Sequence, residues 1–312
     1  MHPQVSPYGE ALRKQLPFEL YRTNLYGAFS TPPPPDDFNP AVASPATLVK
    51  HGLMWKRPRK VDSPSLLRAW DRVFNRKWVA SDRVVPILKP QTGKTHVLRS
   101  LAKPVDHGYT SANWSGGVIQ GQWATALGFW EVPAGGPNSS SWIGLDGFSS
   151  DDVLQAGIEQ RAAADGEAQY VAWFEWFAPP ETNSPLYICQ TDVTNFPLGI
   201  GHQVFCSIQY ILNKTAGQIY FANDTTGQHF CITLAPPPGA KLAGDSMEWI
   251  VEAPLGGGEF APVQFTTALG CSADSQTVGN PQNGDHIEIV DNHQRLTSVE
   301  LGDDSVTIRF AG

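Results

Sequence analysis

Two stretches of the sequence place glutamates among aromatic residues in an alternating pattern. In residues 170–177, YVAWFEWF, alternation puts Trp173 and Glu175 on one face of a strand. In residues 246–252, SMEWIVE, it puts Glu248 and Glu252 on one face. Burying a carboxylate is costly unless it is hydrogen-bonded or lines a wet groove. The pattern therefore predicts a groove whose acids can transfer protons.

A carboxamide is the second candidate for chemistry. Residues 141–147, SWIGLDG, predict a short strand that ends in an Asp-Gly turn, with Trp142 and Asp146 on one face. Gln155 follows in the next apolar run and can stand on the same sheet surface, where its amide offers donors that never titrate. From these residues alone, Gln155 and each glutamate also fit a purely structural role, as ordinary polar residues of a sheet.

The composition indicates the scaffold that must position these groups. The chain of 312 residues has 41% hydrophobic and only 17% charged residues, with 29 Gly and 26 Pro, which favours a turn-rich all-β protein. We predict an antiparallel two-sheet β-sandwich of the jelly-roll or concanavalin-like kind, with a partly helical N-terminal extension. The expected strands are residues 113–119, 125–132, 141–145, 153–159, 170–177, 203–212, 218–223, 228–234, 246–252, 263–268, 286–290 and 306–310.

Charge divides the chain in two. Residues 1–108 hold 17 Lys and Arg against 8 Asp and Glu, a net charge of +9, whereas residues 109–312 hold 5 against 22, a net charge of −17. We therefore expect an extension, 1–108, that is attracted to the acidic sandwich domain, 109–312. Residues 1–43 and 81–108 are predicted to be extended linkers, and Ser-Pro pairs at 44–45 and 63–64 predict the starts of two helices.

The second predicted helix, from Ser63 to about Ala80, is amphipathic and basic. Apolar residues recur at helical spacing, while Arg68, Arg72 and Arg76 lie four apart on another face. This basic face is either solvated or docks onto the acidic domain.

Five short motifs resemble one known family. They are NWSGG at 113–117, SWIGLDG at 141–147, LQAG at 154–157, YVAWFEW at 170–176 and MEWIVE at 247–252. In this order they resemble the eqolisins, which are glutamic peptidases: acid endopeptidases with a β-sandwich fold. The resemblance covers about residues 110–270. The chain departs from the fungal pattern at Glu159, Val171 and Phe177 and in the positions of its cysteines, so subsite preferences and disulfides do not carry over.

The resemblance implies specific roles. The catalytic pair would be Gln155 and Glu252, which activate a water that attacks the peptide bond. The supporting groove positions would be Trp114, Trp142, Asp146, Glu159, Trp173 and Glu175. The substrate would be a protein or peptide. The basic residues 1–108 would be an inhibitory prosegment that silences the enzyme until acidification.

Further expectations concern cofactors, thiols and partners. We expect no metal and no other cofactor, because the eight His form no cluster with metal-ligand spacing. The four cysteines, Cys189, Cys206, Cys231 and Cys271, are compatible with two disulfides or with free thiols. We expect a monomer that binds neither nucleic acid nor membranes. The N-terminal residues show no signal peptide, yet the activity favours a secreted or otherwise acidic extracellular or periplasmic setting.

Two alternatives remain open from the sequence. One is a glycoside hydrolase on a jelly-roll sandwich, with Glu175 and Glu252 as its acid and nucleophile. The other is a non-catalytic binding module that keeps the motifs as core packing.

Overall fold

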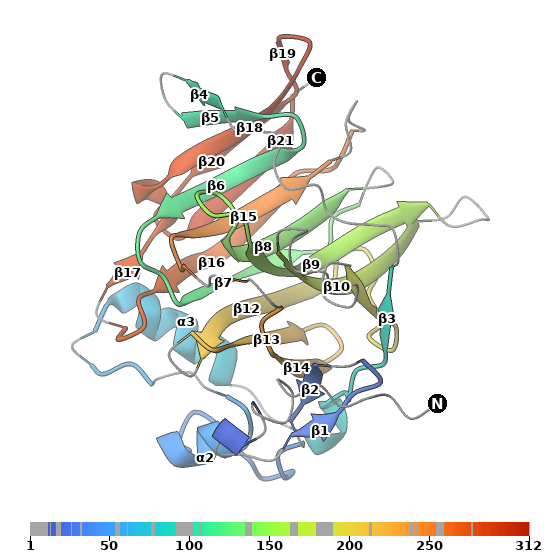
Figure 1. Ribbon diagram of the computed structural model, residues 1–312, viewed down its shortest axis with the longest axis vertical. Helices are drawn as coiled ribbons and strands as arrows, with labels where there is room; N and C mark the ends of the chain where they lie inside the picture. The colour runs from blue at the N-terminus through green and yellow to red at the C-terminus, as the bar shows by residue number, and fades with distance from the viewer. Residues whose placement is uncertain are drawn as a thin grey trace.

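Two large β-sheets form the molecule, with two helices beside one of them (Figure 1). The computed structural model describes residues 12, 14–16, 20–25, 27–31, 33–53, 57–60, 62–75, 79–91, 103–105, 108–134, 139–162, 168–178, 190–211, 214–237, 240, 243–253, 259–275 and 277–311. The helices described from end to end are α2 (Pro45–Lys50) and α3 (Pro64–Phe74), with short 3₁₀ turns η1 (Ala80–Asp82) and η3 (Pro281–Asn283).

Hydrogen bonding sets the order of the strands within each sheet. The ten-stranded sheet runs β1 (Tyr21–Arg22), β2 (Ala28–Ser30), β14 (His229–Leu234), β13 (Ala216–Asn223), β12 (Gln203–Ile211), β7 (Thr125–Glu131), β16 (Val263–Cys271), β21 (Ser305–Phe310) and β20 (Thr297–Leu301), with β17 (Val278–Gly279) beside β16. The eleven-stranded sheet runs β3 (Leu88–Pro90), β11 (Thr191–Val193), β10 (Ala168–Phe177), β9 (Val153–Ala162), β8 (Ser140–Asp146), β15 (Ser246–Glu252), β6 (Trp114–Gln120), β18 (Asp285–Asp291), β5 (Gly108–Ser111) and β4 (Lys103–Val105), with β19 (Gln294–Arg295) beside β18.

The predicted β-sandwich is confirmed. Each of the twelve expected strands coincides with an observed one, and the Asp146-Gly147 turn joins β8 to β9 with positive φ at both residues, 66° and 96°. The sheets are not wholly antiparallel, because β5 and β18 pair in parallel.

Alternation along the strands separates a core from an outer face. The main core lies between the sheets and takes Leu154, Ala156 and Ile158 from β9, together with Trp249 and Val251 from β15. The intervening residues of these strands, Gln155 and Glu248 among them, must face away from the ten-stranded sheet. The predicted site residues therefore lie mainly on the outer face of the eleven-stranded sheet.

The two helices pack on the opposite side of the molecule. On α3, Leu66, Trp70, Val73 and Phe74 join a buried cluster with outward residues of the ten-stranded sheet, such as Phe129. The predicted start of this helix is confirmed, but the helix ends at Phe74 and not near residue 80, because Asn75 caps it. The docking is chiefly apolar.

The basic face of α3 contributes little charge pairing. Arg72 lies over the ring of Phe129, 3.7 Å from its centroid, and donates to the hydroxyls of Thr266 and Thr267. Arg68 makes one long ion pair of 3.9 Å with Asp304, in which both side chains are exposed. Arg76 lies outside the described residues. Exposed pairs of this kind contribute about 0–1 kcal/mol, so apolar burial dominates the docking.

The N-terminal extension contributes strands to both sheets and is not a free linker. β2 pairs with β14 at one edge of the ten-stranded sheet. β3 pairs with β11 at one edge of the eleven-stranded sheet, and β4 lies at the opposite edge of that sheet. The prediction of plain extended linkers at 1–43 and 81–108 missed these strands.

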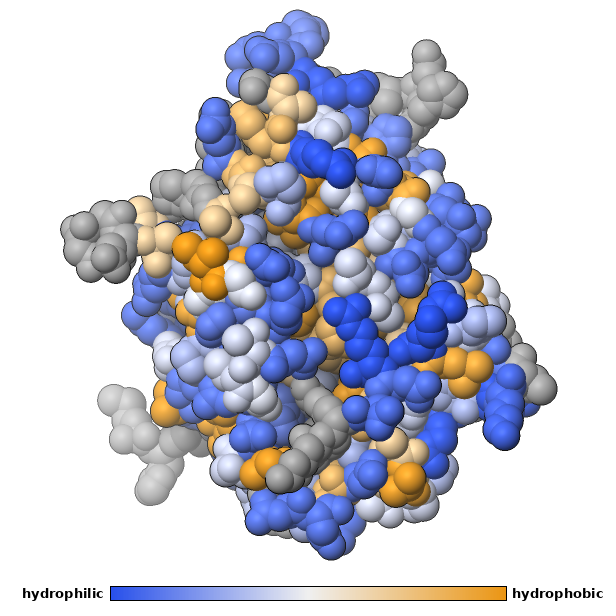
Figure 2. Space-filling view, turned by 180° about the vertical axis from the view of Figure 1, so that it is seen from behind, coloured by the Kyte–Doolittle hydropathy of each residue, from blue (hydrophilic) through white to orange (hydrophobic). Residues whose placement is uncertain are grey.

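Three cysteines are buried in the described part of the chain. Cys206, Cys231 and Cys271 are free thiols, and Cys189 lies outside the described residues. Among the described residues, no helix is long and apolar enough to cross a membrane. Seen from behind, hydrophilic residues cover most of the surface, with apolar ones scattered between them (Figure 2).

Candidate active site

One row of directly opposed residues crosses four strands of the eleven-stranded sheet. Glu175 on β10 lies opposite Gln155 on β9, Gln155 lies opposite Gly144 on β8, and Gly144 lies opposite Glu248 on β15. Directly opposed residues share a face of the sheet. The row therefore gathers one carboxamide and two carboxylates on the outer face, with a glycine between the amide and Glu248.

Gly144 leaves the space in which these groups meet. A Cβ at this position would lie 3.0 Å from Glu248 Oε2 and 2.8 Å from the ring of Trp142. The Glu248 carboxylate therefore extends over Gly144 toward β9. Two strand spacings separate the Cα atoms of Gln155 and Glu248 by about 10 Å, which two side chains and one small molecule can span.

A hydrogen bond to Glu175 fixes the Gln155 amide. Gln155 Nε2 donates to Glu175 Oε2 over 2.9 Å, and Gln155 makes no direct hydrogen bond to Glu248. Gln155 Oε1 is buried and has no hydrogen-bond partner in the described part of the chain. Because an amide nitrogen has two N–H groups, one donor and the oxygen of Gln155 are not used by the hydrogen bond to Glu175.

Glu252 lies elsewhere on the same face. It is opposite Ser140, four residues along β8 from Gly144, which places its Cα about 16 Å from that of Gln155. Its half-buried carboxylate accepts a hydrogen bond of 3.2 Å from Asn113 Nδ2. The structure thus does not bring the two residues of the predicted pair together, whereas it does bring Glu248 toward Gln155.

The predicted tryptophans form an apolar patch beside the row. Trp114, Trp142 and Trp173 belong to one buried cluster with Ile250, and the rings of Trp114 and Trp142 meet edge to face at 4.9 Å. Trp142 and Ile250 are directly opposed, two residues along their strands from Gly144 and Glu248. The patch is positioned to support an apolar side chain next to the row.

Asp146, the last residue of β8, has a buried carboxylate that is fixed by hydrogen bonds. Its carboxylate accepts hydrogen bonds of 2.7 Å from the hydroxyl of Tyr210, a residue of the core between the sheets, and from the amide of Asp245. This differs from the prediction that it lines the groove with Trp142. Burial raises the pKa of Asp146 to about 6 against these hydrogen bonds, which favour the charged form.

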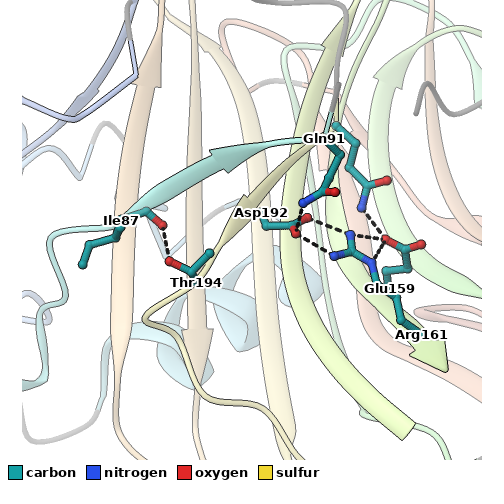
Figure 3. Close-up of polar contacts among 7 residues, drawn as sticks. Ile87, Gln91, Glu159, Arg161, Asp192 and Thr194 are labelled. Carbon is teal, nitrogen blue, oxygen red and sulfur yellow. Dashed lines mark hydrogen bonds and ion pairs between the residues drawn. The ribbon is translucent and has the colours of Figure 1, made fainter. Parts of the chain in front are cut away.

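Glu159 on β9 is connected through Arg161 to Asp192 on β11, near one edge of the sheet. Arg161 Nε donates to Glu159 over 2.8 Å, and both Nη atoms of Arg161 donate to Asp192 over 2.6 and 2.7 Å. Gln91, which follows β3, donates to the same Asp192 over 2.6 Å, as Figure 3 shows. The predicted supporting residue Glu159 is thus engaged in a network that joins the extension to the sheet.

Sequence reasoning did not give Glu248 a catalytic role, although it placed Glu248 on the same face as Glu252. The glycine in SWIGLDG, Gly144, lies beside Glu248 only through the pairing of β8 with β15, so the linear sequence held no signal that singled out this glutamate. Among the described residues, no group of three His, Cys, Asp or Glu side chains is arranged to hold a metal ion.

Known proteins resemble this chain in sequence and in fold. The Peptidase A4 family matches residues 112–310. Aspergillopepsin-2 of Aspergillus niger is 28% identical over 232 residues, which are 64% of this chain and 78% of that protein. Scytalido-glutamic peptidase, solved with a peptide-based transition-state analogue, superposes with a TM-score of 0.53 at 21% identity, over 67% of this chain and 100% of that one.

A second solved structure supports the same fold. SCP-B, a member of the eqolisin family in complex with the tripeptide Ala-Ile-His, superposes with a TM-score of 0.52 at 20% identity, over 67% of this chain and 100% of that one. The family match covers most of the sandwich and contains the whole row from Gln155 to Glu248. The chain therefore belongs to the Peptidase A4 family, the eqolisin glutamic peptidases.

Proposed function

We propose that this peptidase is an acid endopeptidase whose catalytic pair is Gln155 and Glu248. The observation that carries the assignment is the position of Glu248 Oε2 over Gly144, in the same row as Gln155. This replaces Glu252, which the sequence indicated, with the glutamate that the strand register places opposite Gly144, next to the amide. Gln155 keeps the role that the sequence indicated.

The mechanism follows from the chemistry of the pair. Glu248, as a carboxylate, takes a proton from a water bound above Gly144, and the water attacks the scissile carbonyl carbon. The free N–H of Gln155 donates to the oxyanion that develops. Glu248 then returns the proton to the leaving amine, which breaks the peptide bond. Because the amide carries no charge, one ionised carboxyl suffices and the reaction can run in acid.

Glu175 is the positioning residue in this proposal. By accepting one N–H of Gln155 it fixes the plane of the amide, so that the second N–H has a defined direction. Trp142 and Ile250, beside the row, would support an apolar side chain of the substrate. The strand register places Glu252 and Glu159 four residues along the sheet, where they would meet more distant parts of a peptide.

The experiment is peptide hydrolysis by the full chain between about pH 3 and 7. We expect cleavage of denatured casein at acidic pH, and a loss of about 10²- to 10³-fold in kcat for Gln155→Ala, as for other oxyanion donors. Gln169→Ala, an exposed glutamine on the neighbouring strand β10, is the matched control and should leave the rate unchanged. Full activity of the Gln155→Ala chain would reject the assignment.

The two alternatives have less support. The glycoside hydrolase needs Glu175 and Glu252 as a facing pair with Gln155 turned away, but Gln155 is hydrogen-bonded to Glu175 and Glu252 lies in another row. The binding module does not account for a buried amide and carboxylate that flank a glycine.

We also propose that the N-terminal extension keeps the enzyme inactive. The supporting observation is that Gln155 and Glu248 are only 1% and 0% exposed, so a substrate cannot reach them in this form. The extension contributes β3 and β4 to opposite edges of the sheet that carries the pair. An acidic extracellular or periplasmic setting, where such control is useful, stays a prediction.

A cleavable sequence placed between β3 and β4 tests this control. We expect the uncut chain to show a lag in acid while it processes itself, and the chain cut beforehand at neutral pH to hydrolyse peptide without a lag. The same sequence placed in the exposed turn at Asn292 and His293 should leave the lag in place when cut. An uncut, unprocessed chain that works at full rate from the start would contradict inhibition by the extension.

A further inference from the structure

Three stretches of the extension converge on one strand of the ten-stranded sheet. Thr31 follows β2, His51 follows α2, and Arg83 follows η1, and all three are buried. β2 pairs with β14. Arg83 forms a β-bridge with His229 of β14, and the amide of Val84 donates to the carbonyl of His229 over 2.8 Å. We call this group of Thr31, His51, Arg83 and His229 the anchor of the extension.

Arg83 links the members of the anchor by hydrogen bonds. Its Nη2 donates to the hydroxyl of Thr31 and to the carbonyl of His51, the latter over 3.2 Å. The thiol of Cys231, on β14, donates to the carbonyl of Gly52 over 3.6 Å. Gly52 has a φ of 74°, and a Cβ there would clash with the side chain of Thr31. The anchor is therefore closely packed, and the position of His51 is fixed by its neighbours.

The anchor is cationic. Arg83 is 5% exposed, and no carboxylate among the described residues forms an ion pair with it. Asp82, which precedes Arg83, has its carboxylate near Gly227 instead. Lys50 adjoins His51 on α2, and burial raises the pKa of the Cys231 thiol, which keeps it neutral. An additional positive charge here would be opposed from several sides.

His51 is the group that can acquire that charge. Its ring packs on Phe38, with centroids 4.5 Å apart, and its Nδ1 is buried without a hydrogen-bond partner among the described residues. Burial, and then the charges of Lys50 and Arg83, lower the pKa of His51 from its ordinary value of 6.5. The docked imidazole is thus held neutral at a pH where a free one takes up a proton.

We propose that His51 is an acid sensor, whose protonation inside the cationic anchor loosens the extension from the ten-stranded sheet. The released form binds the proton more tightly than the docked form does. Docking therefore has its full strength above pH 6.5 and weakens as the pH falls from 6.5 toward the lower docked value. Over that window one extra proton lowers the docking equilibrium constant by up to about tenfold per pH unit.

The exposed ion pair between Arg68 and Asp304 adds little to docking, and its loss would leave the apolar contacts of α3 intact. The inference concerns docking and does not depend on which residues cut peptides.

Amide hydrogen exchange at about pH 7, 6 and 5, corrected for intrinsic rates, tests the sensor in the full chain carrying Gln155→Ala to prevent self-cleavage. We expect protection of residues 45–53 and 83–84 to fall by up to about tenfold per pH unit, and to stay flat in His51→Gln. His293→Asn, in an exposed turn with a φ of 67°, is the matched control and should keep the slope.

Other outcomes would overturn the proposal. A slope that persists in His51→Gln but disappears in His229→Gln or Asp304→Asn would assign the sensor to another group. If His51→Gln fails to dock at any pH, NMR titration of His51 in the parent chain decides: a pKa below 6.5 supports the sensor, and a value of 6.5 or higher rejects it.

Discussion

Glu248→Gln is expected to lower kcat for peptide cleavage by about 10²- to 10⁴-fold, the usual range for loss of a general base. Glu252→Gln is expected to retain most of the activity. Gln155 lies opposite Gly144, and Gly144 lies opposite Glu248, so only the first of the two glutamates on β15 extends over the glycine toward the amide. Glutamine keeps the size of the side chain but cannot accept the proton.

The two variants form a matched pair, because they remove one charge each from the same face of the same strand. The measurement is kcat and KM on one peptide at acidic pH, together with thermal unfolding to show that both variants fold. Loss of kcat in Glu252→Gln together with normal turnover in Glu248→Gln would return the catalytic role to Glu252. A rise in KM alone for Glu252→Gln would instead fit contact with a distant part of the peptide.

The sequence predicts that both glutamates share one face of the strand, but it does not predict which of them lies near Gln155. Alternation along residues 246–252 correctly puts Glu248 and Glu252 on one face, because the side-chain period of a strand is local. Which of them meets Gln155 depends on the register of β15 with β8 and of β8 with β9, which joins residues about a hundred positions apart. A motif in linear order does not contain that register.

Several short strands that the sequence missed have a similar cause. The twelve expected strands are mostly long and rich in β-branched and aromatic residues, whereas β2, β3 and β11 have three residues each. Such short strands exist because a neighbouring edge supplies hydrogen-bond partners, which is a tertiary effect. The extension consequently reads as a linker in the sequence, although it completes both sheets.

Charge asymmetry predicted docking of the extension but not its physical basis. The net charges of +9 for residues 1–108 and −17 for residues 109–312 suggested ion pairs between α3 and the domain. The contacts of α3 with the domain instead include a buried apolar cluster, a cation–π contact of Arg72, its hydrogen bonds to Thr266 and Thr267, and one long ion pair. The apolar face of the helix, and not its arginines, determines where it packs.

Asp146→Asn is expected to stabilise the protein at pH 7 by up to about 3 kcal/mol and to change its stability little at about pH 4. Burial raises the pKa of Asp146 from 3.8 to about 6, so the folded state holds this proton more tightly than the unfolded state does. The stability that this group contributes is fully present below about pH 3.8 and is lost as the pH rises through about 6. A pKa difference of about 2 between the folded and unfolded states corresponds to about 3 kcal/mol.

Urea unfolding at about pH 4 and 7 measures this difference, in chains that carry Gln155→Ala so that they do not cut themselves. Asparagine resembles the protonated carboxyl, because its oxygen can still accept from the amide of Asp245 while its NH₂ group faces the hydroxyl of Tyr210. Asp151→Asn removes an exposed charge five residues away and should keep the pH dependence of the parent. If Asp146→Asn also keeps it, the buried carboxylate does not set the acid preference. If it removes the dependence, the loss of stability between those two pH values originates at one residue at the end of the β8 strand.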